Sequence, residues 1–316
     1  MSFRTFLKLV EIQTKIASIF PFLVGSLFVY YRYETFNPLN TMIFFMAMLL
    51  FDLTTTTINN YMDYRKASSQ TYREQRNIIG QKAIPEKVVI LTIFTMLAIA
   101  TGLGLWLVFR TDLLVLLIGM ICFAIGIFYT FGPIPLSRMP LGEVFSGVTM
   151  GFGIIFLIIY VNGFDQGIAS ITIAGWEVQL QANVRLLAEI LLISLPCVFT
   201  IANLMLANNI CDLEEDINNH RYTLPYYIGK RYAIMLFNVL YATTFVSILT
   251  AVLFNILPII MLLSLVVTYP VFKHVHQFNQ KQIKEITFPL AVKNLVIVNS
   301  ASVVMLAVSI LSSISH

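Results

Sequence analysis

Charged residues are scarce in this chain. Only 11% of its 316 residues are Asp, Glu, Lys or Arg, whereas 58% are hydrophobic. A soluble globular domain carries about 25% charged residues, so this composition excludes an ordinary soluble fold. Apolar stretches of about 20 residues, the length that crosses a bilayer, recur from one end of the sequence to the other. The composition therefore predicts an all-α polytopic membrane protein.

Cysteine and histidine are also rare. The three cysteines (Cys122, Cys197 and Cys211) have no paired spacing, which argues against a disulfide framework or a zinc motif. The four histidines likewise lack the spacing that is typical of metal ligands. The first apolar run has no small-residue cleavage site, so we expect it to be a mature span and not a signal peptide.

Nine apolar segments are predicted to span the membrane as helices. They cover residues 16–31, 39–58, 87–109, 113–131, 141–162, 187–208, 232–254, 256–272 and 288–312. Ahead of them, residues 1–15 combine apolar side chains at helical spacing with three basic residues, which predicts an amphipathic helix at the interface. Residues 163–184 alternate polar and apolar side chains, which predicts a small hairpin.

The distribution of basic residues tests this topology. Nine spans place the two termini on opposite sides, and a cytoplasmic N-terminus puts all but three of the 20 Lys and Arg on the inner side. The exceptions are Arg32, Arg110 and Arg185. This asymmetry favours both nine spans and a cytoplasmic N-terminus. It also places two long polar loops, 59–86 and 209–231, on the inner face.

One polar motif, Asn-Asn-x-x-Asp, closes two of the predicted helices. The two copies read Asn59-Asn60-Tyr61-Met62-Asp63 and Asn208-Asn209-Ile210-Cys211-Asp212, the second continuing to Asp216. Residues four apart share a helix face, so each Asn lies beside the Asp that follows it. The matched positions favour a duplication within a single domain, with a first half of about 1–140 and a second half of about 141–316.

These motifs have the chemistry of a metal site for a phosphorylated substrate. Amide and carboxylate oxygens suit Mg²⁺, which takes one or two carboxylates together with substrate phosphates. Basic residues follow each copy: Lys66, Arg73 and Lys82 after the first, and Arg221 after the second. Carboxylates and cations on one face favour a diphosphate partner, whose oxygens bind both. The alternative is that Asp63, Asp212 and Asp216 only mark solvated helix ends.

Three acidic residues fall within predicted spans, where an ionisable group is a functional candidate by default. Asp52 shares a helix face with Asn59 and Asp63, which favours a functional role. The alternative is a purely structural role, in which Asp52 accepts hydrogen bonds from hydroxyls such as those of Thr54–Thr57. Glu143 begins the fifth span, where the helix dipole alone would favour an acid. Glu189 follows Arg185 by four residues, so an ion pair explains it without a function.

An ion-coupled carrier is the alternative class of protein. Carriers also contain intramembrane acids and internal repeats. Their ionisable groups, however, are expected near the bilayer midplane, whereas both motifs here lie at inner helix ends beside basic loops. This position favours chemistry on a phosphorylated lipid over ion transport, and no nucleic-acid partner is expected.

The motifs and the topology resemble the UbiA superfamily of intramembrane aromatic prenyltransferases. Within it, the sequence is most similar to the 1,4-dihydroxy-2-naphthoate polyprenyltransferase branch. The segments that carry this resemblance are 59–66, 80–84, 129–130, 141–143, 208–216 and 222–224. The chain departs from the pattern at Asn60, where the family usually has Asp, and at Cys211, where the branch commonly has Arg.

The resemblance implies Mg²⁺-dependent transfer of a polyprenyl group from its diphosphate to 1,4-dihydroxy-2-naphthoate. The acceptor loses its carboxyl group and gives demethylmenaquinone; another aromatic acceptor stays open. The reaction would take place at the cytoplasmic face of a bacterial plasma membrane.

The resemblance also implies roles for individual residues. Magnesium would bind Asn59 with Asp63, and Asn208 with Asp212 and Asp216. The cations Lys66, Arg73, Lys82 and Arg221 would bind the diphosphate, Tyr129 would line the cavity, and Asp52 and Glu143 would lie at the substrate. Three further lysines, Lys273, Lys281 and Lys284, are expected to anchor the protein to anionic lipid.

Overall fold

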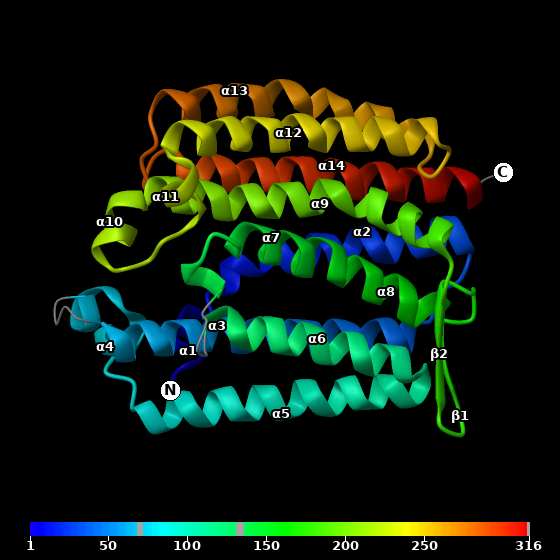
Figure 1. Ribbon diagram of the computed structural model, residues 1–316, viewed down its shortest axis with the longest axis horizontal. Helices are drawn as coiled ribbons and strands as arrows, with labels where there is room; N and C mark the ends of the chain where they lie inside the picture. The colour runs from blue at the N-terminus through cyan, green and yellow to red at the C-terminus, as the bar shows by residue number, and fades with distance from the viewer. Residues whose placement is uncertain (68–71, 131–135, 315–316) are drawn as a thin grey trace. The chain divides into compact units, whose positions relative to one another are not determined.

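The computed structural model describes residues 1–67, 72–130 and 136–314, and most of them are helical (Figure 1). Eight helices in these ranges are long and apolar enough to cross a membrane. A ninth predicted span coincides with a shorter apolar helix, Leu113–Tyr129, and its predicted end at residue 131 lies outside the described residues. The all-α polytopic class is therefore confirmed, whereas the count of nine and the side of the N-terminus stay predictions.

The chain folds into two compact units, each built from two stretches of sequence. The first consists of Met1–Ile16 and Pro38–Pro135, and the second of Ala17–Asn37 and Leu136–His316. The helices of the first unit are α1 (Phe3–Leu9), α3 (Pro38–Lys66), α4 (Ile78–Gln81), α5 (Glu86–Arg110) and α6 (Leu113–Thr130). The second unit contains α2 (Ile16–Tyr33) from Ala17 on, α7 (Gly142–Ser146), α8 (Ile154–Gly163), β1 (Ala169–Ala174), β2 (Glu177–Ala182), α9 (Val184–Cys211), α10 (Leu213–Asn218), α11 (Leu224–Ile228), α12 (Lys230–Leu253), α13 (Thr268–Gln280) and α14 (Phe288–Ile314).

In the first unit, the end of α3 that carries the first motif is supported by its neighbours. Leu9 of α1, Ile79 of α4 and Val89 of α5 are buried in one apolar cluster, and Tyr61 and Tyr64 of the motif segment pack against it. Helix α4 is only one turn long, and it is capped by Asn77, whose side-chain oxygen accepts a hydrogen bond from the Ile79 amide at 2.9 Å. Such a cap stabilises a helix start by about 1 kcal/mol.

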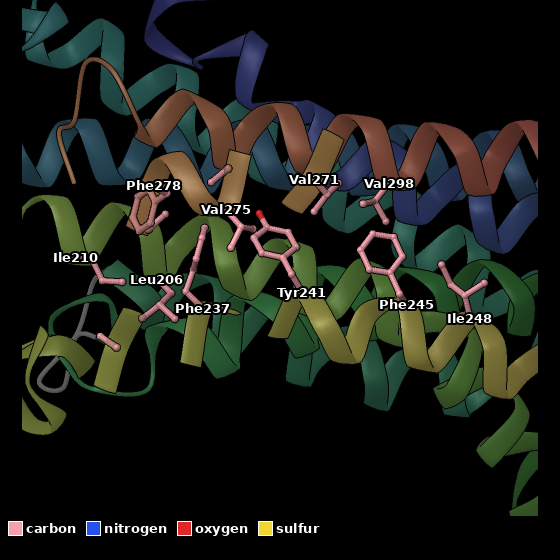
Figure 2. Packing of buried hydrophobic residues seen from close by; sticks show 13 residues of the cluster. Leu206, Ile210, Phe237, Tyr241, Phe245, Ile248, Val271, Val275, Phe278 and Val298 are labelled. Atoms are coloured by element: carbon pink, nitrogen blue, oxygen red, sulfur yellow. The ribbon is translucent and has the colours of Figure 1, made fainter. Parts of the chain in front are cut away.

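The core of the second unit forms where α9, α12, α13 and α14 pack together. Figure 2 shows the cluster, in which Phe237 lies against both Tyr241 and Phe278. The Phe237 and Phe278 rings stack with their centroids 4.4 Å apart, and Tyr241 meets Phe237 edge-on at 5.0 Å. Leu206 and Ile210 of α9 belong to the same cluster, so the helix end that bears the second motif is held on a rigid support.

One predicted span is shorter at its C-terminal end than the helix in the structure. We predicted a helix over 256–272, but the structure has a 3-10 segment, Ile259–Val267, and then α13, which continues to Gln280. The apolar run ends near residue 272, but Val271, Val275 and Phe278 recur at helical spacing and stay buried. Helix α13 is thus amphipathic, and a search for uniformly apolar runs misses its second half.

The segment between α8 and α9 forms the predicted hairpin. Strands β1 and β2 pair antiparallel, from Ala169 opposite Ala182 to Ala174 opposite Glu177. Gly175 lies in the turn with φ of +62°, a conformation that glycine adopts without strain. The hairpin is therefore confirmed.

Close packing holds α7 near the second motif. A π-helical stretch, Gly147–Gly153, joins α7 to α8, and Gly147 and Gly151 lie against α9. A Cβ atom added at Gly151 would lie 2.6 Å from the Val198 Cα atom, a distance that real Cβ atoms do not reach. Only glycine permits this approach, which brings the start of α7 onto the end of α9.

Candidate functional site

The second motif lies where α9 ends and α10 begins. The Asn208 Nδ2 atom donates a hydrogen bond to the Asp212 Oδ2 atom at 3.2 Å, so the predicted neighbours on one helix face do meet. Asp212 is the residue between the two helices, and its carbonyl accepts from the Asp216 amide at 2.7 Å. The structure therefore brings Asn208, Asp212 and Asp216 together within the second unit.

Sequence analysis missed one residue of this cluster, Lys284. Its ammonium group donates to both the Asn208 Oδ1 atom and the Asp212 Oδ2 atom, from the loop between α13 and α14. The expectation that Lys284 is a lipid anchor is therefore wrong, because its charge is directed to the second motif. No sequence signal links the two residues, since 72 positions separate Lys284 from Asp212.

Asp216 is nearly completely buried beside Arg221. The Arg221 Nε atom lies 3.4 Å from the Asp216 Oδ1 atom, and the Arg221 amide donates to the Asp216 carbonyl at 2.8 Å. The turn between them passes through His220, whose φ of +55° is left-handed. Burial raises the pKa of Asp216, and the nearby guanidinium partly opposes this rise. The Asp216 Oδ2 atom has no hydrogen-bond partner among the described residues.

Glu143 is held against the second motif through Asn209. The Asn209 Nδ2 atom donates to the Glu143 Oε1 atom at 2.8 Å, and the exposed fractions are only 2% for Asn209 and 4% for Glu143. Asn209 therefore ties α9 to α7, while its neighbour Asn208 contacts Asp212. The Glu143 Oε2 atom is buried and has no partner among the described residues. Glu143 also lies in the first turn of α7, where the helix dipole favours an acid.

In the first unit, α3 continues through the first motif to Lys66. Asn59 and Asp63 therefore lie one helical turn apart on one face, as predicted, and both are partly buried. Lys66 is exposed at the helix end.

The Asn60 side chain forms hydrogen bonds with the end of α1 and the segment that follows it. Its Nδ2 atom donates to the Leu9 carbonyl at 3.0 Å and to the Glu11 Oε1 atom at 3.1 Å. Its own backbone carbonyl accepts from the Asn77 side chain at 2.9 Å. An aspartate at position 60 could not donate, and it would face both a carbonyl oxygen and a carboxylate. These contacts give a physical reason for Asn at a position where the resemblance led us to expect Asp.

Replacing Asn60 by Asp is expected to destabilise the first unit. The variant loses two donated hydrogen bonds and places two carboxylates together, which we expect to lower the free energy of unfolding by about 1–3 kcal/mol. Thermal unfolding of the purified protein in detergent measures the change. The double variant N60D/E11Q removes the repulsion and should recover part of the loss. A melting temperature unchanged in N60D would contradict this role.

Asp52 takes part in a buried ion pair. The Lys15 Nζ atom lies 2.8 Å from the Asp52 Oδ1 atom and 3.2 Å from the Asp52 carbonyl, and it also donates to the Thr56 hydroxyl. The exposed fractions of the two side chains are 3% for Lys15 and 16% for Asp52. The charge of Asp52 is thus balanced by an ammonium group, a partner that neither sequence interpretation named. In the second unit, Glu189 pairs with Arg185, as predicted, and also with Arg32.

Arg73 lies beside the first motif. Its guanidinium is 4.6 Å from the centroid of the Tyr64 ring, a distance typical of a cation–π contact. Next to it is a cavity of about 620 Å³. The residues that line this cavity are Tyr64, Ala67, Arg73, Glu74, Ile79, Gly80, Ala83, Ile84, Pro85 and Glu86. Lys82 is exposed near it, and Tyr129 is partly buried at the end of α6.

Gly80 sets the position of Arg73. A Cβ atom at Gly80 would lie 1.9 Å from the Arg73 carbonyl oxygen, so the variant G80A must displace that segment. We expect it to lower the free energy of unfolding by about 1–3 kcal/mol, the usual range for overpacking. Differential scanning fluorimetry in detergent measures the effect. The control G104A adds a methyl group on α5 where nothing lies within 4 Å, and it should leave stability unchanged or slightly higher. Equal melting temperatures for the two variants would contradict this packing.

The donor atoms of both motifs fit a hard divalent cation. Among the described residues there is no group of three or more His, Cys, Asp or Glu side chains that could enclose a metal. Magnesium does not require such a group, because it commonly takes one or two carboxylates and completes its shell with water and substrate phosphates. Asp216 supplies a buried carboxylate oxygen that has no partner within the described part of the chain, and a cation would satisfy it.

The apolar helices define a polytopic α-helical membrane protein, and an amide–carboxylate motif lies at the end of one long helix in each unit. The chain belongs to the UbiA prenyltransferase family, whose sequence profile matches residues 18–296. It is thus a prenyltransferase enzyme and not an ion-coupled carrier.

Individual relatives agree with this family. The chain is 26% identical over 241 residues to 1,4-dihydroxy-2-naphthoate octaprenyltransferase of Bacillus subtilis (strain 168), and the matched region covers 74% of this chain and 69% of the relative. The fold of this chain is similar to that in the apo structure of a UbiA homolog from Aeropyrum pernix K1, with a TM-score of 0.70, 16% identity and coverage of 92% of this chain and 98% of the homolog. A UbiA homolog from Archaeoglobus fulgidus bound to DMAPP and Mg²⁺ gives a TM-score of 0.63, 13% identity and coverage of 96% and 99%.

Proposed function

We propose that this enzyme transfers a polyprenyl group from polyprenyl diphosphate to 1,4-dihydroxy-2-naphthoate, with loss of the acceptor's carboxyl group to give demethylmenaquinol, the reduced form of demethylmenaquinone. The observation that carries the proposal is the cluster of Asn208, Asp212 and Asp216, which has Arg221 and Lys284 beside it. Acidic and basic groups so close together suit a diphosphate that arrives with a divalent cation. The naphthoate acceptor is supported by the Bacillus subtilis relative.

Each of the two units would supply its own set of acidic and amide side chains for a metal ion. In the second unit, Asn208, Asp212 and Asp216 would hold one Mg²⁺ through their oxygens. In the first unit, Asn59 and Asp63 would hold another, since they lie one turn apart on α3. Bound Mg²⁺ supplies Lewis-acid neutralisation, which makes diphosphate a better leaving group.

The basic residues stabilise charge that develops on the diphosphate. Arg221 is the best placed, because its Nε atom lies at Asp216 and its backbone closes the turn after α10. In the first unit, the Arg73 guanidinium lies over the Tyr64 ring, while the side chains of Lys66 and Lys82 are exposed. Charge-assisted hydrogen bonds of this kind are about twice as strong as neutral ones.

The bond changes balance without an oxidant. The bond between the prenyl carbon and the diphosphate oxygen breaks, and its electron pair leaves with the diphosphate. The electron-rich ring carbon that bears the carboxylate forms the new carbon–carbon bond, and the carboxylate then leaves as CO₂ and returns its electron pair to the ring. Exclusion of water protects the allylic cation, and aromatic side chains such as Tyr129 would stabilise it.

The proposed location uses the distribution of charged residues along the chain. The protein is a multi-pass membrane protein, and the excess of Lys and Arg on one side supports a cytoplasmic active site in a bacterial plasma membrane.

A comparison of acceptors tests the substrate assignment. Membranes that contain the protein are incubated with Mg²⁺, a long-chain prenyl diphosphate and either 1,4-dihydroxy-2-naphthoate or 4-hydroxybenzoate, and products are read by mass. We expect a prenylated, decarboxylated naphthoquinol and little prenylated hydroxybenzoate. Membranes without the protein provide the background. Transfer to 4-hydroxybenzoate alone would overturn the naphthoate assignment and leave the family unchanged.

A further inference from the structure

The loop that carries Lys284 is held in place on both sides. The Ile283 amide donates to the Thr287 hydroxyl at 2.8 Å, and the Thr287 amide donates to the Ile283 carbonyl at the same distance. Thr287 is buried. The Gln282 side chain also donates to the Phe278 carbonyl at 2.6 Å, at the end of α13. This backbone therefore fixes the origin of the Lys284 side chain.

The Lys284 side chain itself remains movable. It is 36% exposed, and its ammonium lies over the Phe288 ring, 4.9 Å from the ring centroid. A lysine of this kind is a compact charge on a flexible stem, which can change partners without moving the backbone. The loop is thus rigid, whereas the charge that it presents is not.

The ammonium occupies the oxygens that the proposed function assigns to a metal. Lys284 contacts Asn208 Oδ1 and Asp212 Oδ2 at once, the two oxygens that α9 directs to one side. An ammonium and a divalent cation cannot share these oxygens, because like charges a few ångströms apart repel strongly at a partly buried site. Metal binding here therefore requires Lys284 to leave.

We propose that Lys284 is an exchangeable counter-ion of the metal site and a ligand of the donor's diphosphate. Without metal, its ammonium neutralises Asp212. When metal and diphosphate bind, the ammonium moves from Asp212 to a diphosphate oxygen. This inference rests on the proposed function and adds a diphosphate-binding residue to it.

Such an exchange makes metal and diphosphate bind cooperatively. Metal alone must displace Lys284 and leave the ammonium without its carboxylate. Diphosphate offers the displaced ammonium a new anion, so each ligand raises the affinity of the other by the same factor. The site is then filled when the complete metal–diphosphate substrate is present, and free metal is held weakly.

Manganese binding tests the exchange without any turnover. Purified full-length protein in detergent is titrated with Mn²⁺, and bound Mn²⁺ is measured by electron paramagnetic resonance with and without inorganic pyrophosphate at matched free Mn²⁺. The test variant is Lys284→Met, which keeps the stem and removes the charge. The matched control is Lys281→Met, which removes an exposed charge from the same loop. Lys284→Arg retains a cation, and gel filtration with thermal unfolding establishes that each variant is folded.

We expect wild-type protein and K281M to bind Mn²⁺ at least about fivefold more tightly with pyrophosphate than without it. K284M should bind Mn²⁺ alone roughly fivefold more tightly than wild type, because no ammonium has to be displaced. Its gain from pyrophosphate should be much smaller, and K284R should retain the wild-type gain. The loss of the pyrophosphate gain in K284M identifies the exchange, because removing a nearby charge that does not exchange would raise metal affinity equally with and without pyrophosphate.

The failures are distinguishable. If K284M matches K281M both with and without pyrophosphate, the exchange is overturned while the metal site stands. If wild-type protein binds no Mn²⁺ in either condition, or if Asp212→Asn binds it equally well, the metal assignment of the proposed function fails. Should K284M not fold, Lys284→Gln is measured in the same way and decides between the same results.

Discussion

Replacing Asp212 by Asn is expected to abolish turnover, with kcat lowered by about 10³-fold or more. The substitution removes the negative charge that, in the proposed function, holds the metal on the leaving diphosphate. Such neutralisation contributes several kcal/mol to the transition state, and about 4 kcal/mol corresponds to a 10³-fold change in rate. Folding should be retained, because Asp212 precedes α10 at the cap position, where Asn is as well tolerated as Asp.

The matched control for this variant is Glu214→Gln. Glu214 is an exposed acid on the first turn of α10, two residues from Asp212, and its neutralisation changes the net charge by the same amount. We expect E214Q to keep activity within about twofold of wild type, since surface charges act weakly. Initial rates at saturating donor and acceptor, with the folded fraction determined by gel filtration, provide the comparison. Near-normal activity in D212N would refute the metal assignment in the second unit.

Replacing Asp63 by Asn should cause a comparable loss, about 10³-fold in kcat, through the first motif. Asp63 and Asn59 lie on one face of α3, so the substitution leaves two amides and no carboxylate to hold a cation there. The helix itself should be unaffected, because Asn and Asp have similar propensities. The same initial-rate assay applies.

Asp165→Asn is the control for D63N. Asp165 is exposed in the turn after α8, outside both motifs, and undergoes the identical chemical change. D165N should retain wild-type activity. If D63N also does so while remaining folded, the first motif has no role in catalysis and a single metal, held in the second unit, would have to suffice.

Long apolar runs explain why most of the fold could be predicted. In a membrane, each helix satisfies its own backbone hydrogen bonds, so its position follows from local composition. The error at α13 shows the limit of this rule. Val271, Val275 and Phe278 are buried against other helices of the second unit, and that burial, which is not a local property, prolongs the helix through polar residues.

The faces of the motifs were predictable for the same local reason. Asn208 and Asp212 are four residues apart on a helix, and they meet as this spacing requires. The partners of single side chains were not predictable. Lys284 reaches Asp212, Lys15 reaches Asp52 and Asn209 reaches Glu143 across long sequence separations. Tertiary packing alone decides these pairs.

Asn60 and Asn209 illustrate a further limit. Both belong to the repeated Asn-Asn-x-x-Asp pattern, and the sequence does not distinguish them from Asn59 and Asn208. In the structure, Asn60 holds the segment after α1 and Asn209 holds α7, so the second Asn of each copy supports its helix within its own unit. Adjacent residues on a helix point about 100° apart, which gives the two asparagines different partners.

The most direct test of the account is a transfer assay in membranes that contain this protein. They are supplied with a long-chain prenyl diphosphate and 1,4-dihydroxy-2-naphthoate, and diphosphate release and product mass are measured with Mg²⁺ and after addition of EDTA. The account predicts a prenylated, decarboxylated naphthoquinol formed in step with diphosphate, both lost with EDTA and regained with excess Mg²⁺. Product formation that persists when all divalent metal is removed would contradict it.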